Sequence, residues 1–451
     1  VAIVVSLAIY PFTFLHLAKI NLVTGSFLAC LVLLGIPLLA MSAMNPLLVA
    51  LKGAVARPET GDAGSGWVFF VSTMGSVAGV LFATFIAIPY LTNFRSFALL
   101  GAAVGVAALA SALAGRSLSP TARVHTSAMA LVGTLAGLAL GIWADDYLGW
   151  KKTLVSFGLR WTMVEHYPTP FGSLKVIDVA SGQTSPQRFL LNDGILQNIN
   201  DAEEPSRSLA VFTHALEALA IASVSSPRRA LVLGLGTGAV PMGLAARGID
   251  VDVVDINPAL DGLIRRHFAF KDQRVTLHWG DARTFANACT TPYDIVIMDL
   301  FNSDGMPEHL LTEEVFHHLG RCVTAKGSLI VNAFYSNAGT EGYRMIFAAI
   351  NKTFPSVRVF GDLSAATSNI FVLAQHLARP LDEIDISPIP QRVSYDVRSI
   401  LATVRTVGVD LPLKDDAASD EHNRFAVNIA PALVALRRHL VSIIPSQYLI
   451  N

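Results

Sequence analysis

The charged residues of this chain are distributed so unevenly that they divide it into two parts suited to different solvents. The chain of 451 residues contains 33 Lys and Arg and 34 Asp and Glu residues, yet only ten of these lie within residues 1–150. A charged side chain in the hydrocarbon core of a bilayer is costly, and a spanning helix needs about 20 mostly apolar residues. The first third is therefore predicted to be a membrane domain, and the remainder a water-exposed domain.

Five apolar stretches are candidate membrane spans: residues 1–18, 23–50, 67–91, 97–114 and 124–143. Pro37 and Pro46 predict that the second span is kinked or broken, because proline removes a helical hydrogen bond. Small residues in "GSVAGVLFA" and "LVGTLAGLALG" favour close helix packing. His16 and Asn45 are polar, and structural hydrogen bonds are the favoured interpretation for both. No charged residue lies inside a candidate span, which argues against an ion-coupled transporter.

The orientation of the membrane domain is not set by its own charges, because Lys and Arg residues divide equally between the two sides. A second part that uses a cytosolic nucleotide would face the cytosol. We therefore expect an integral membrane protein of a bacterial inner membrane, with its catalytic domain in the cytoplasm and the lipid bilayer as a partner. The chain begins with Val1 inside an apolar stretch, which is compatible with truncation and with further helices upstream.

The net charge and the cysteines limit the kinds of binding partner that are expected. The formal net charge is −1 and no basic block occurs, so a nucleic-acid partner is not expected. A small-molecule substrate is expected instead, and the sequence leaves a homodimer open. Cys30, Cys289 and Cys322 form neither a CxxC pair nor a cluster with histidine, so neither a disulfide framework nor a metal site is predicted.

A small β unit is predicted after the membrane domain. Residues 173–179 alternate as a strand does. Residues 188–191 and 195–199 are predicted to pair as a hairpin, because the intervening Asn192-Asp193-Gly194 suits a tight turn. The helical spacing of apolar residues over 207–223 predicts a helix.

The centre of the chain then alternates strands with helices. Five strands are predicted, at residues 230–234, 250–255, 274–278, 294–299 and 327–334. Helices are expected near 239–247 and 339–351, and another after Asn257-Pro258, an N-cap followed by proline. An antiparallel pair, 357–361 with 369–375, ends the pattern. This order predicts a doubly wound α/β, Rossmann-like domain preceded by the small β unit.

Four domains are predicted from these patterns. Residues 1–147 form a transmembrane helical domain and residues 148–200 the small β unit. Residues 201–378 form the Rossmann-like nucleoside-binding domain, and residues 379–451 a C-terminal extension with a helical stretch near 426–443.

The glycine-rich loop in "LVLGLGTGAV", residues 231–240, follows the first strand of that domain. Gly234, Gly236 and Ala239 fit G-x-G-x-x-G/A, which suits a dinucleotide or S-adenosylmethionine. Acidic residues follow the next three strands: Asp255, where it could bind ribose hydroxyls, Asp281 in "GDA", where it could accept from an adenine amino group, and Asp299. Together with the terminal antiparallel pair, these three acids favour a Rossmann-like domain of the S-adenosylmethionine-methyltransferase type over one that binds a dinucleotide.

These motifs resemble those of the spermidine/spermine synthase family, and especially its membrane-fused, spermidine-synthase-like branch. The resemblance covers residues 165–335. The family's "LDGxxQ" hairpin is matched at 193–197, its "GGGDGG" loop by "GLGTGA" at 234–239, and its "VEID" by "VDIN" at 254–257. The catalytic-loop aspartate falls on Asp299, and "DLFNSDGMPEHLLTEEVF" at 299–316 is similar to the D-x-F…P-x-H-L-L-T pattern of the membrane branch.

The resemblance implies a role for each matched residue. Asp299 and Asp304 would be catalytic. The loop that covers the pocket would contribute Asn302, Glu308 and His309. The co-substrate would be S-adenosylmethionine or its decarboxylated form, with no metal, held by Gln197, Gly234, Gly236, Thr237, Gly238, Asp255, Asp281 and Ala282.

Three positions depart from the family pattern. Ser208-Leu209 stands where the family has Tyr-His, Asn302 replaces the second acid of the catalytic loop, and Thr237 replaces the aspartate of "GGGDGG". In the family these positions hold the polyamine or the aminopropyl amine. An aspartate at 4 Å would repel the carboxylate of S-adenosylmethionine by roughly 4 kcal/mol at an effective dielectric constant of 20. Because Thr237 removes that repulsion, we expect the pocket to accept S-adenosylmethionine itself.

The resemblance implies an enzyme that transfers an aminopropyl-type group from a sulfonium nucleoside and releases methylthioadenosine, with Asp299 as the base. Three alternatives stay open. The enzyme could cleave S-adenosylmethionine alone, as a lyase or cyclase without an amine acceptor. It could be a methyltransferase that releases S-adenosylhomocysteine. It could also be a membrane-tethered sensor of nucleosides or polyamines without catalytic activity.

Overall fold

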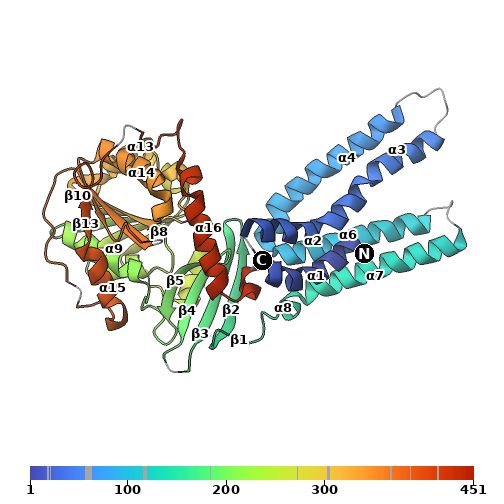
Figure 1. Cartoon of the computed structure of the whole chain (residues 1–451), viewed down its shortest axis with the longest axis horizontal. Coiled ribbons are helices and arrows are strands. Elements are labelled where there is room, and N and C mark those ends of the chain that lie inside the picture. The colour runs from blue at the N-terminus through green and yellow to red at the C-terminus, as the bar shows by residue number, and fades with distance from the viewer. Residues whose placement is uncertain are drawn as a thin grey trace. The chain divides into compact units, whose positions relative to one another are not determined.

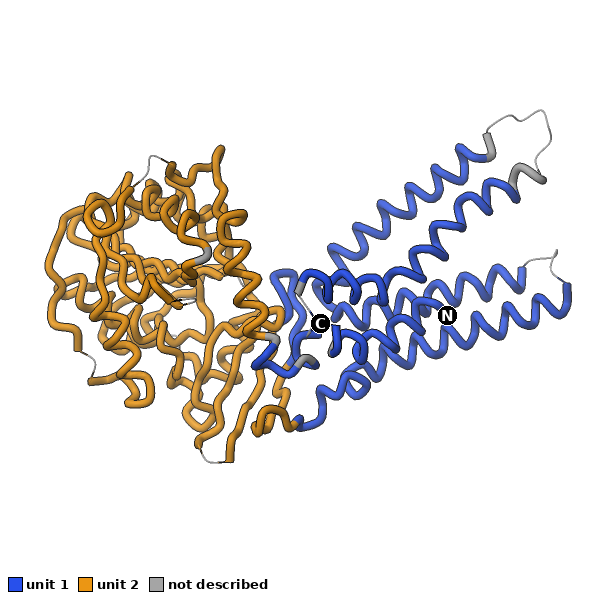
Figure 2. The backbone as a smooth tube through the Cα atoms, viewed as in Figure 1, with its two compact units in different colours: residues 1–154, 166–173, 441–451 blue, residues 155–165, 174–440 orange. Residues whose placement is uncertain are grey.

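The computed structural model describes residues 1–17, 20, 22–55, 63–114, 119–182, 184–271, 273–301, 305–365, 368–385, 387–413 and 416–450. The chain divides into two compact units (Figure 2). The first comprises residues 1–154, 166–173 and 441–451, and the second comprises residues 155–165 and 174–440.

Helices make up most of the first unit (Figure 1). They are α1 (Ala2–Leu17), α2 (Leu22–Ser42), α3 (Met44–Val55), α4 (Ala63–Phe82), α5 (Ile88–Tyr90), α6 (Asn93–Ala114), α7 (Pro120–Ile142) and α8 (Ala144–Tyr147), with a π-helical turn at Ala83–Ala87. Within the described residues, four stretches are long and apolar enough to cross a membrane: Val23–Leu51, Ser65–Tyr90, Asn93–Ala114 and Pro120–Ile142. The remaining predicted stretch, residues 1–18, corresponds to α1, which has only 16 residues.

Local details of these helices follow the sequence. The predicted break in the second stretch is confirmed, because α2 ends at Ser42 and α3 begins at Met44. The polar side chains make the expected structural hydrogen bonds: Asn45 Nδ2 donates to Ser72 Oγ at 3.1 Å, and His16 Nδ1 lies 2.8 Å from the Phe12 carbonyl oxygen.

Small residues bring α6 and α7 into close contact, as predicted for "LVGTLAGLALG", whereas a Cβ atom on Gly75 or Gly79 of "GSVAGVLFA" would meet nothing within 4 Å, so that part of the prediction is not confirmed. A Cβ atom on Gly105 would lie 2.4 Å from Thr134 Oγ1, and one on Gly137 would lie 2.8 Å from the backbone nitrogen of Ala102. Larger side chains at either glycine would therefore force the two helices apart.

A five-stranded sheet follows α8, with its strands in sequential order. Its strands are β1 (Leu154–Ser156), β2 (Leu159–Thr169), β3 (Gly172–Ala180), β4 (Gln187–Asn192) and β5 (Ile195–Asp201). The predicted hairpin is confirmed by the pairing of Asn192 with Ile195. Its turn residues Asp193 and Gly194 have φ values of 49° and 79°, the left-handed conformations that a tight hairpin turn of this length requires. The sequence did not predict β1 and β2.

The second unit contains an eight-stranded sheet in the order β13-β11-β12-β10-β9-β6-β7-β8. Its strands are β6 (Arg229–Leu233), β7 (Asp250–Asp255), β8 (Val275–Trp279), β9 (Tyr293–Met298), β10 (Val323–Tyr335), β11 (Ser356–Phe360), β12 (Ser368–Gln375) and β13 (Val404–Thr406). Strand β6 pairs in parallel with both β7 and β9, so the strand order reverses beside it. Strands β11 and β12 pair antiparallel, as predicted. The predicted Rossmann-like fold is confirmed by this order.

Helices cover both faces of this sheet. Leu231 and Leu233 of β6 face one apolar core, and Ala230 and Val232 face the other. The first core includes side chains of α12 (Ala282–Asn287), α13 (Glu313–Cys322), α14 (Thr340–Thr353) and α16 (Phe425–Ile443). The second includes those of α9 (Val211–Ser223), α10 (Ala239–Ala246), α11 (Ala259–His267) and α15 (Gln391–Ala402), together with residues of β3 and β4.

One expectation about the cysteines is wrong. The structure pairs Cys289 with Cys322 in a disulfide, with Cα atoms 5.8 Å apart and a sequence separation of 33. Cys289 follows α12 and Cys322 ends α13, and these two helices pack side by side. The contact depends on the fold, so the spacing of the cysteines could not reveal it.

Candidate functional site

The carboxyl ends of β6, β7, β8 and β9 bring four of the predicted site segments to one edge of the sheet. Backbone hydrogen bonds hold them together: Asp299 N donates to Leu233 O at 2.8 Å, Gly234 N to Val254 O at 2.8 Å, and Gly280 N to Asp255 O at 2.9 Å. In doubly wound folds, ligands bind outside the carboxyl ends of the strands, where the strand order reverses. The glycine loop and the acids at 255, 281 and 299 surround that point.

The glycines of the loop serve different purposes. Gly234 and Gly238 have φ values of +102° and +81°, and a Cβ atom on them would lie 2.1 Å from the Asp299 carbonyl oxygen and 2.3 Å from the Phe270 ring, respectively. These two glycines are therefore required by packing. Gly236 has a φ of +54°, and a Cβ atom there would meet nothing within 4 Å. The loop thus presents bare backbone on an open side at Gly236, where a ligand could approach closely.

Asp255 connects this loop to the end of β7. Its Oδ2 accepts a hydrogen bond from Leu235 N at 2.9 Å, and its Oδ1 accepts one from Asn257 N at 2.8 Å. Burial raises the pKa of Asp255, although these backbone N–H groups act in the opposite direction. The carboxylate is thus held in one orientation by the backbone on both sides, and each oxygen keeps a lone pair for a further donor such as a hydroxyl.

Asp281 caps α12 and lies near the predicted lid. Its Oδ1 accepts from the Thr284 backbone at 2.8 Å, and its Oδ2 lies 3.8 Å from His309 Nε2. Ala282 is buried beside it. Glu308 and His309 lie in a short 3-10 helix, Glu308–Leu310. The structure therefore brings His309 next to Asp281, while Asn302 and Asp304 lie outside the described residues.

Asp299 follows β9 directly and accepts the last of two consecutive hydrogen bonds from asparagines that the sequence did not predict as site residues. Asn332 Nδ2 donates to Asp299 Oδ1 at 2.8 Å, and Asn369 Nδ2 donates to Asn332 Oδ1 at 3.0 Å. Burial of its carboxylate raises the pKa of Asp299 to about 6, partly offset by the hydrogen bond from Asn332. The only sequence signal for Asn332 is one polar residue inside the apolar strand "SLIVNAF".

The side chain of Thr237 is buried beside β5. It is 1% exposed, and its Oγ1 accepts a hydrogen bond from Asn198 Nδ2 at 2.8 Å. The Oδ1 atom of Asn198 accepts from Ser208 Oγ at 3.3 Å, and Ser208 Oγ accepts from Thr213 Oγ1 at 2.8 Å. Two positions that depart from the family pattern, 208 and 237, thus belong to one buried, uncharged network.

Gln197 precedes Asn198 in β5, and its Nε2 donates to Ile195 O at 3.4 Å. It therefore lies on the same strand that contacts the glycine loop through Asn198. Gln197, which is predicted to contact the nucleoside, is thus adjacent in sequence to Asn198 of the buried network.

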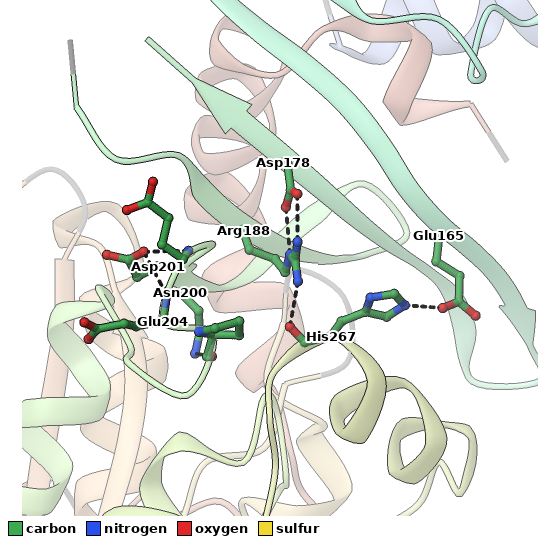
Figure 3. Close-up of polar contacts among 9 residues, drawn as sticks. Glu165, Asp178, Arg188, Asn200, Asp201, Glu204 and His267 are labelled. Carbon is green, nitrogen blue, oxygen red and sulfur yellow. Dashed lines mark hydrogen bonds and ion pairs between the residues drawn. The ribbon is translucent and has the colours of Figure 1, made fainter. Parts of the chain in front are cut away.

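A second set of polar contacts fixes the small sheet to the α/β fold (Figure 3). Arg188 of β4 donates to both carboxylate oxygens of Asp178, at 2.7 and 2.8 Å, and to the backbone oxygen of His267 at 3.0 Å. The imidazole of His267 in turn contacts Glu165 of β2. Since His267 ends α11, these contacts hold the sheet that carries Gln197 and the α/β domain together. No group of three or more metal-ligating side chains occurs among the residues described.

Part of the α/β domain is similar to known proteins. Residues 211–360 match the model of the spermine/spermidine synthase domain. A polyamine aminopropyltransferase of Vibrio vulnificus is 35% identical over 131 residues, which cover 27% of this chain and 44% of that protein. One from Korarchaeum cryptofilum is 24% identical over 139 residues, 29% of this chain and 43% of that protein.

Other similar proteins include a methyltransferase. An N-terminal histidine N-methyltransferase of Emericella nidulans is 28% identical over 168 residues, which cover 35% of this chain and 30% of that protein. A solved structure of a probable spermidine synthase from Corynebacterium glutamicum has a TM-score of 0.43 and 19% identity, covering 54% of this chain and 89% of that one. The chain spans about half the length, or less, of these curated relatives. Residues 211–360 are thus the part of this chain that is similar to the spermine/spermidine synthase family.

Proposed function

We propose that the α/β domain binds a sulfonium nucleoside at the carboxyl ends of β6 to β9 and transfers an aminopropyl-type group from it to an amine. The observation that carries this proposal is the burial of the Asp299 carboxylate and its raised pKa. Its buried carboxylate follows β9, accepts one hydrogen bond from Asn332, and has a pKa raised to about 6. A base with a pKa near the working pH is well suited to take a proton from an attacking amine.

The reaction requires only groups of this kind. The nitrogen lone pair of the amine attacks the side-chain carbon next to the sulfonium, and the electron pair of the carbon–sulfur bond returns to sulfur. Methylthioadenosine leaves as a neutral thioether, and the proton of the amine passes to Asp299. Positioning of the two reactants supplies much of the rate, and proton removal adds about 10²–10⁴-fold.

The buried network at Thr237 supports S-adenosylmethionine as a donor alongside its decarboxylated form. Asn198, Ser208 and Thr237 are uncharged and satisfy one another, so no carboxylate at position 237 repels the carboxylate of S-adenosylmethionine. The same observation favours a second candidate function, the cleavage of S-adenosylmethionine alone by elimination or cyclisation. The relative named as a histidine N-methyltransferase favours the third candidate, methyl transfer, and a sensor would bind without turnover.

Identification of the nucleoside product separates these functions. The purified full chain is incubated with S-adenosylmethionine or its decarboxylated form, with and without putrescine. Amine-dependent release of methylthioadenosine supports aminopropyl transfer. Methylthioadenosine released without an amine supports cleavage of the donor alone, and S-adenosylhomocysteine supports a methyltransferase. Nucleoside binding without any product leaves the sensor.

We propose further that the four apolar helices anchor the enzyme in a bacterial inner membrane, with the α/β domain in the cytoplasm. The length and composition of Val23–Leu51, Ser65–Tyr90, Asn93–Ala114 and Pro120–Ile142 support the anchor. The cytosolic location of sulfonium nucleosides supports the orientation. Protease treatment of intact spheroplasts and of inverted vesicles tests it: the α/β domain should be cleaved only in inverted vesicles. The mass of the detergent-solubilised protein tests whether it is a homodimer.

A further inference from the structure

A segment near the C-terminus contacts the loop that follows Asp299, although it lies outside the region matched by the family model. Asp420 is the centre of this contact. Its carboxylate accepts hydrogen bonds from both terminal nitrogens of Arg283, with Nη1 at 2.9 Å, and from Thr312 Oγ1 at 2.8 Å. These partners come from α12 and from the N-cap of α13. Asp420 therefore joins α12 to the start of α13, the helix in which the loop after β9 ends.

Arg283 connects this contact to the predicted binding residues. It lies two residues after Asp281, and its Nη1 also donates to the backbone oxygen of His309 at 2.9 Å. The same guanidinium thus touches the loop residue that lies 3.8 Å from the Asp281 carboxylate. If Arg283 loses its orientation, both His309 and the start of α12 lose a fixed neighbour.

Backbone contacts continue the same attachment along the loop. Asn423 Nδ2 donates to Glu308 O at 2.8 Å, and Glu313 N donates to Ala418 O at 2.8 Å. The Oε2 atom of Glu314 accepts from Asp420 N at 3.1 Å. Residues 308–314 are therefore held from outside by residues 418–423 at several points.

The C-terminal segment is itself anchored by apolar packing. Phe425 and Ile429 of α16 are 1% and 4% exposed. A Cβ atom on Gly342 of α14 would lie 3.1 Å from Asn428 Cβ, so the two helices are in close contact. Asp420 thus lies five residues before the packed helix α16, whose contacts with α14 hold Asp420 in place against the loop.

Global stability is a poor explanation for this arrangement. The side chains of Arg283 and Asp420 are 25% and 37% exposed, and ion pairs that are this accessible contribute little to the free energy of unfolding. A two-nitrogen contact of Arg with a carboxylate does, however, fix geometry. We propose that Asp420 is a positioning residue: it orients Arg283 and the 308–312 loop so that His309 and Asp281 form the adenine end of the nucleoside pocket.

This inference rests on the proposed nucleoside binding, so the test measures binding directly. The full chain is titrated with methylthioadenosine in a calorimeter, as wild type, Asp420→Asn and Asp261→Asn. Asp261 pairs with Arg265 on α11, at 40% and 39% exposure, and is a matched ion pair away from the loop. Asp420→Asn is expected to weaken methylthioadenosine binding at least tenfold, while Asp261→Asn binds as wild type and all three proteins melt at similar temperatures.

Two further measurements separate positioning from loss of fold. Hydrogen exchange in Asp420→Asn should rise in residues 281–288 and 305–318 and stay unchanged in β6 to β9. Arg283→Gln combined with Asp420→Asn should bind no more weakly than either single variant, because both remove one contact. If wild type and Asp420→Asn bind methylthioadenosine with equal affinity, the role of Asp420 is overturned and the proposed function is not. Failure of the wild type to bind methylthioadenosine would overturn the proposed function and this role together.

Discussion

Asn198 of β5 donates a hydrogen bond to Thr237 of the glycine loop at 2.8 Å, and both side chains are buried. The contact joins the small sheet to the nucleoside loop at the position where the family pattern has an aspartate. A threonine can accept this bond without introducing a charge. Under the proposed function, the residue at position 237 would therefore influence both the choice of donor and the contact between the hairpin and the loop.

Thr237→Asp tests that coupling. The new carboxylate can still accept from Asn198, but it would repel the carboxylate of S-adenosylmethionine and attract the amine of the decarboxylated donor. At roughly 4 Å and an effective dielectric constant of 20, the repulsion amounts to about 4 kcal/mol as an upper bound. We expect the ratio of kcat/KM for the decarboxylated donor over S-adenosylmethionine to rise at least tenfold. Thr237→Ser, which keeps the hydroxyl, should leave the ratio unchanged, and an unchanged ratio in Thr237→Asp would reject the coupling.

Asp299→Asn should abolish turnover while nucleoside binding remains. Loss of a proton acceptor is expected to lower kcat by about 10²–10⁴-fold. Methylthioadenosine affinity, measured by calorimetry, should change less than threefold, because the amide keeps the shape of the carboxylate. A variant with wild-type kcat would remove Asp299 from the mechanism.

The same substitution should stabilise the fold at neutral pH. The pKa of Asp299 is about 6 in the folded protein, above the value of 3.8 for an exposed aspartate. Ionisation of Asp299 therefore destabilises the folded state relative to the unfolded state, and the free energy of unfolding falls as the pH rises from about 4 to about 6. Above this window the cost reaches about 3 kcal/mol, and Asp299→Asn removes it. Chemical denaturation at pH 4 and at pH 7.5 checks this: the variant should gain stability over wild type only at the higher pH.

Asn332→Ala should shift the pH dependence of the reaction. Because the base must be ionised, kcat/KM of the wild type should rise with pH through a midpoint near 6. The hydrogen bond from Asn332 lowers the pKa of Asp299, so its loss should move the midpoint to a higher pH. Ser328→Ala, on the same strand but bonded to Gln375, serves as the control and should keep the wild-type midpoint. An Asn332→Ala profile identical to wild type would show that the amide does not tune Asp299.

The sequence predicted those parts of the fold whose signal is local. The Asp193-Gly194 turn, the strands β6 to β10 and the acids at their ends all follow from neighbouring residues. Strand β2 was missed because its side chains are mostly exposed or half-buried, which leaves little apolar alternation. Contacts between distant residues could not be predicted. Asn332 contacts Asp299, and Asn369 contacts Asn332, only in the folded sheet. Asp420 contacts Arg283 across 137 residues.

The glycines of the loop offer a test of where the nucleoside lies that does not depend on turnover. Gly236→Ala places a methyl group in open space, and its φ of +54° makes the substitution cost about 1 kcal/mol of left-handed strain. If the nucleoside approaches the loop there, methylthioadenosine binding should fall at least tenfold while the fold survives. Gly248→Ala is the control, since it also has a positive φ, +85°, and open space around it but lies in the turn after α10. Equal methylthioadenosine affinity in the two variants would place the nucleoside elsewhere, because backbone strain is common to both and only Gly236 belongs to the loop that contacts Asp255 and Asp299.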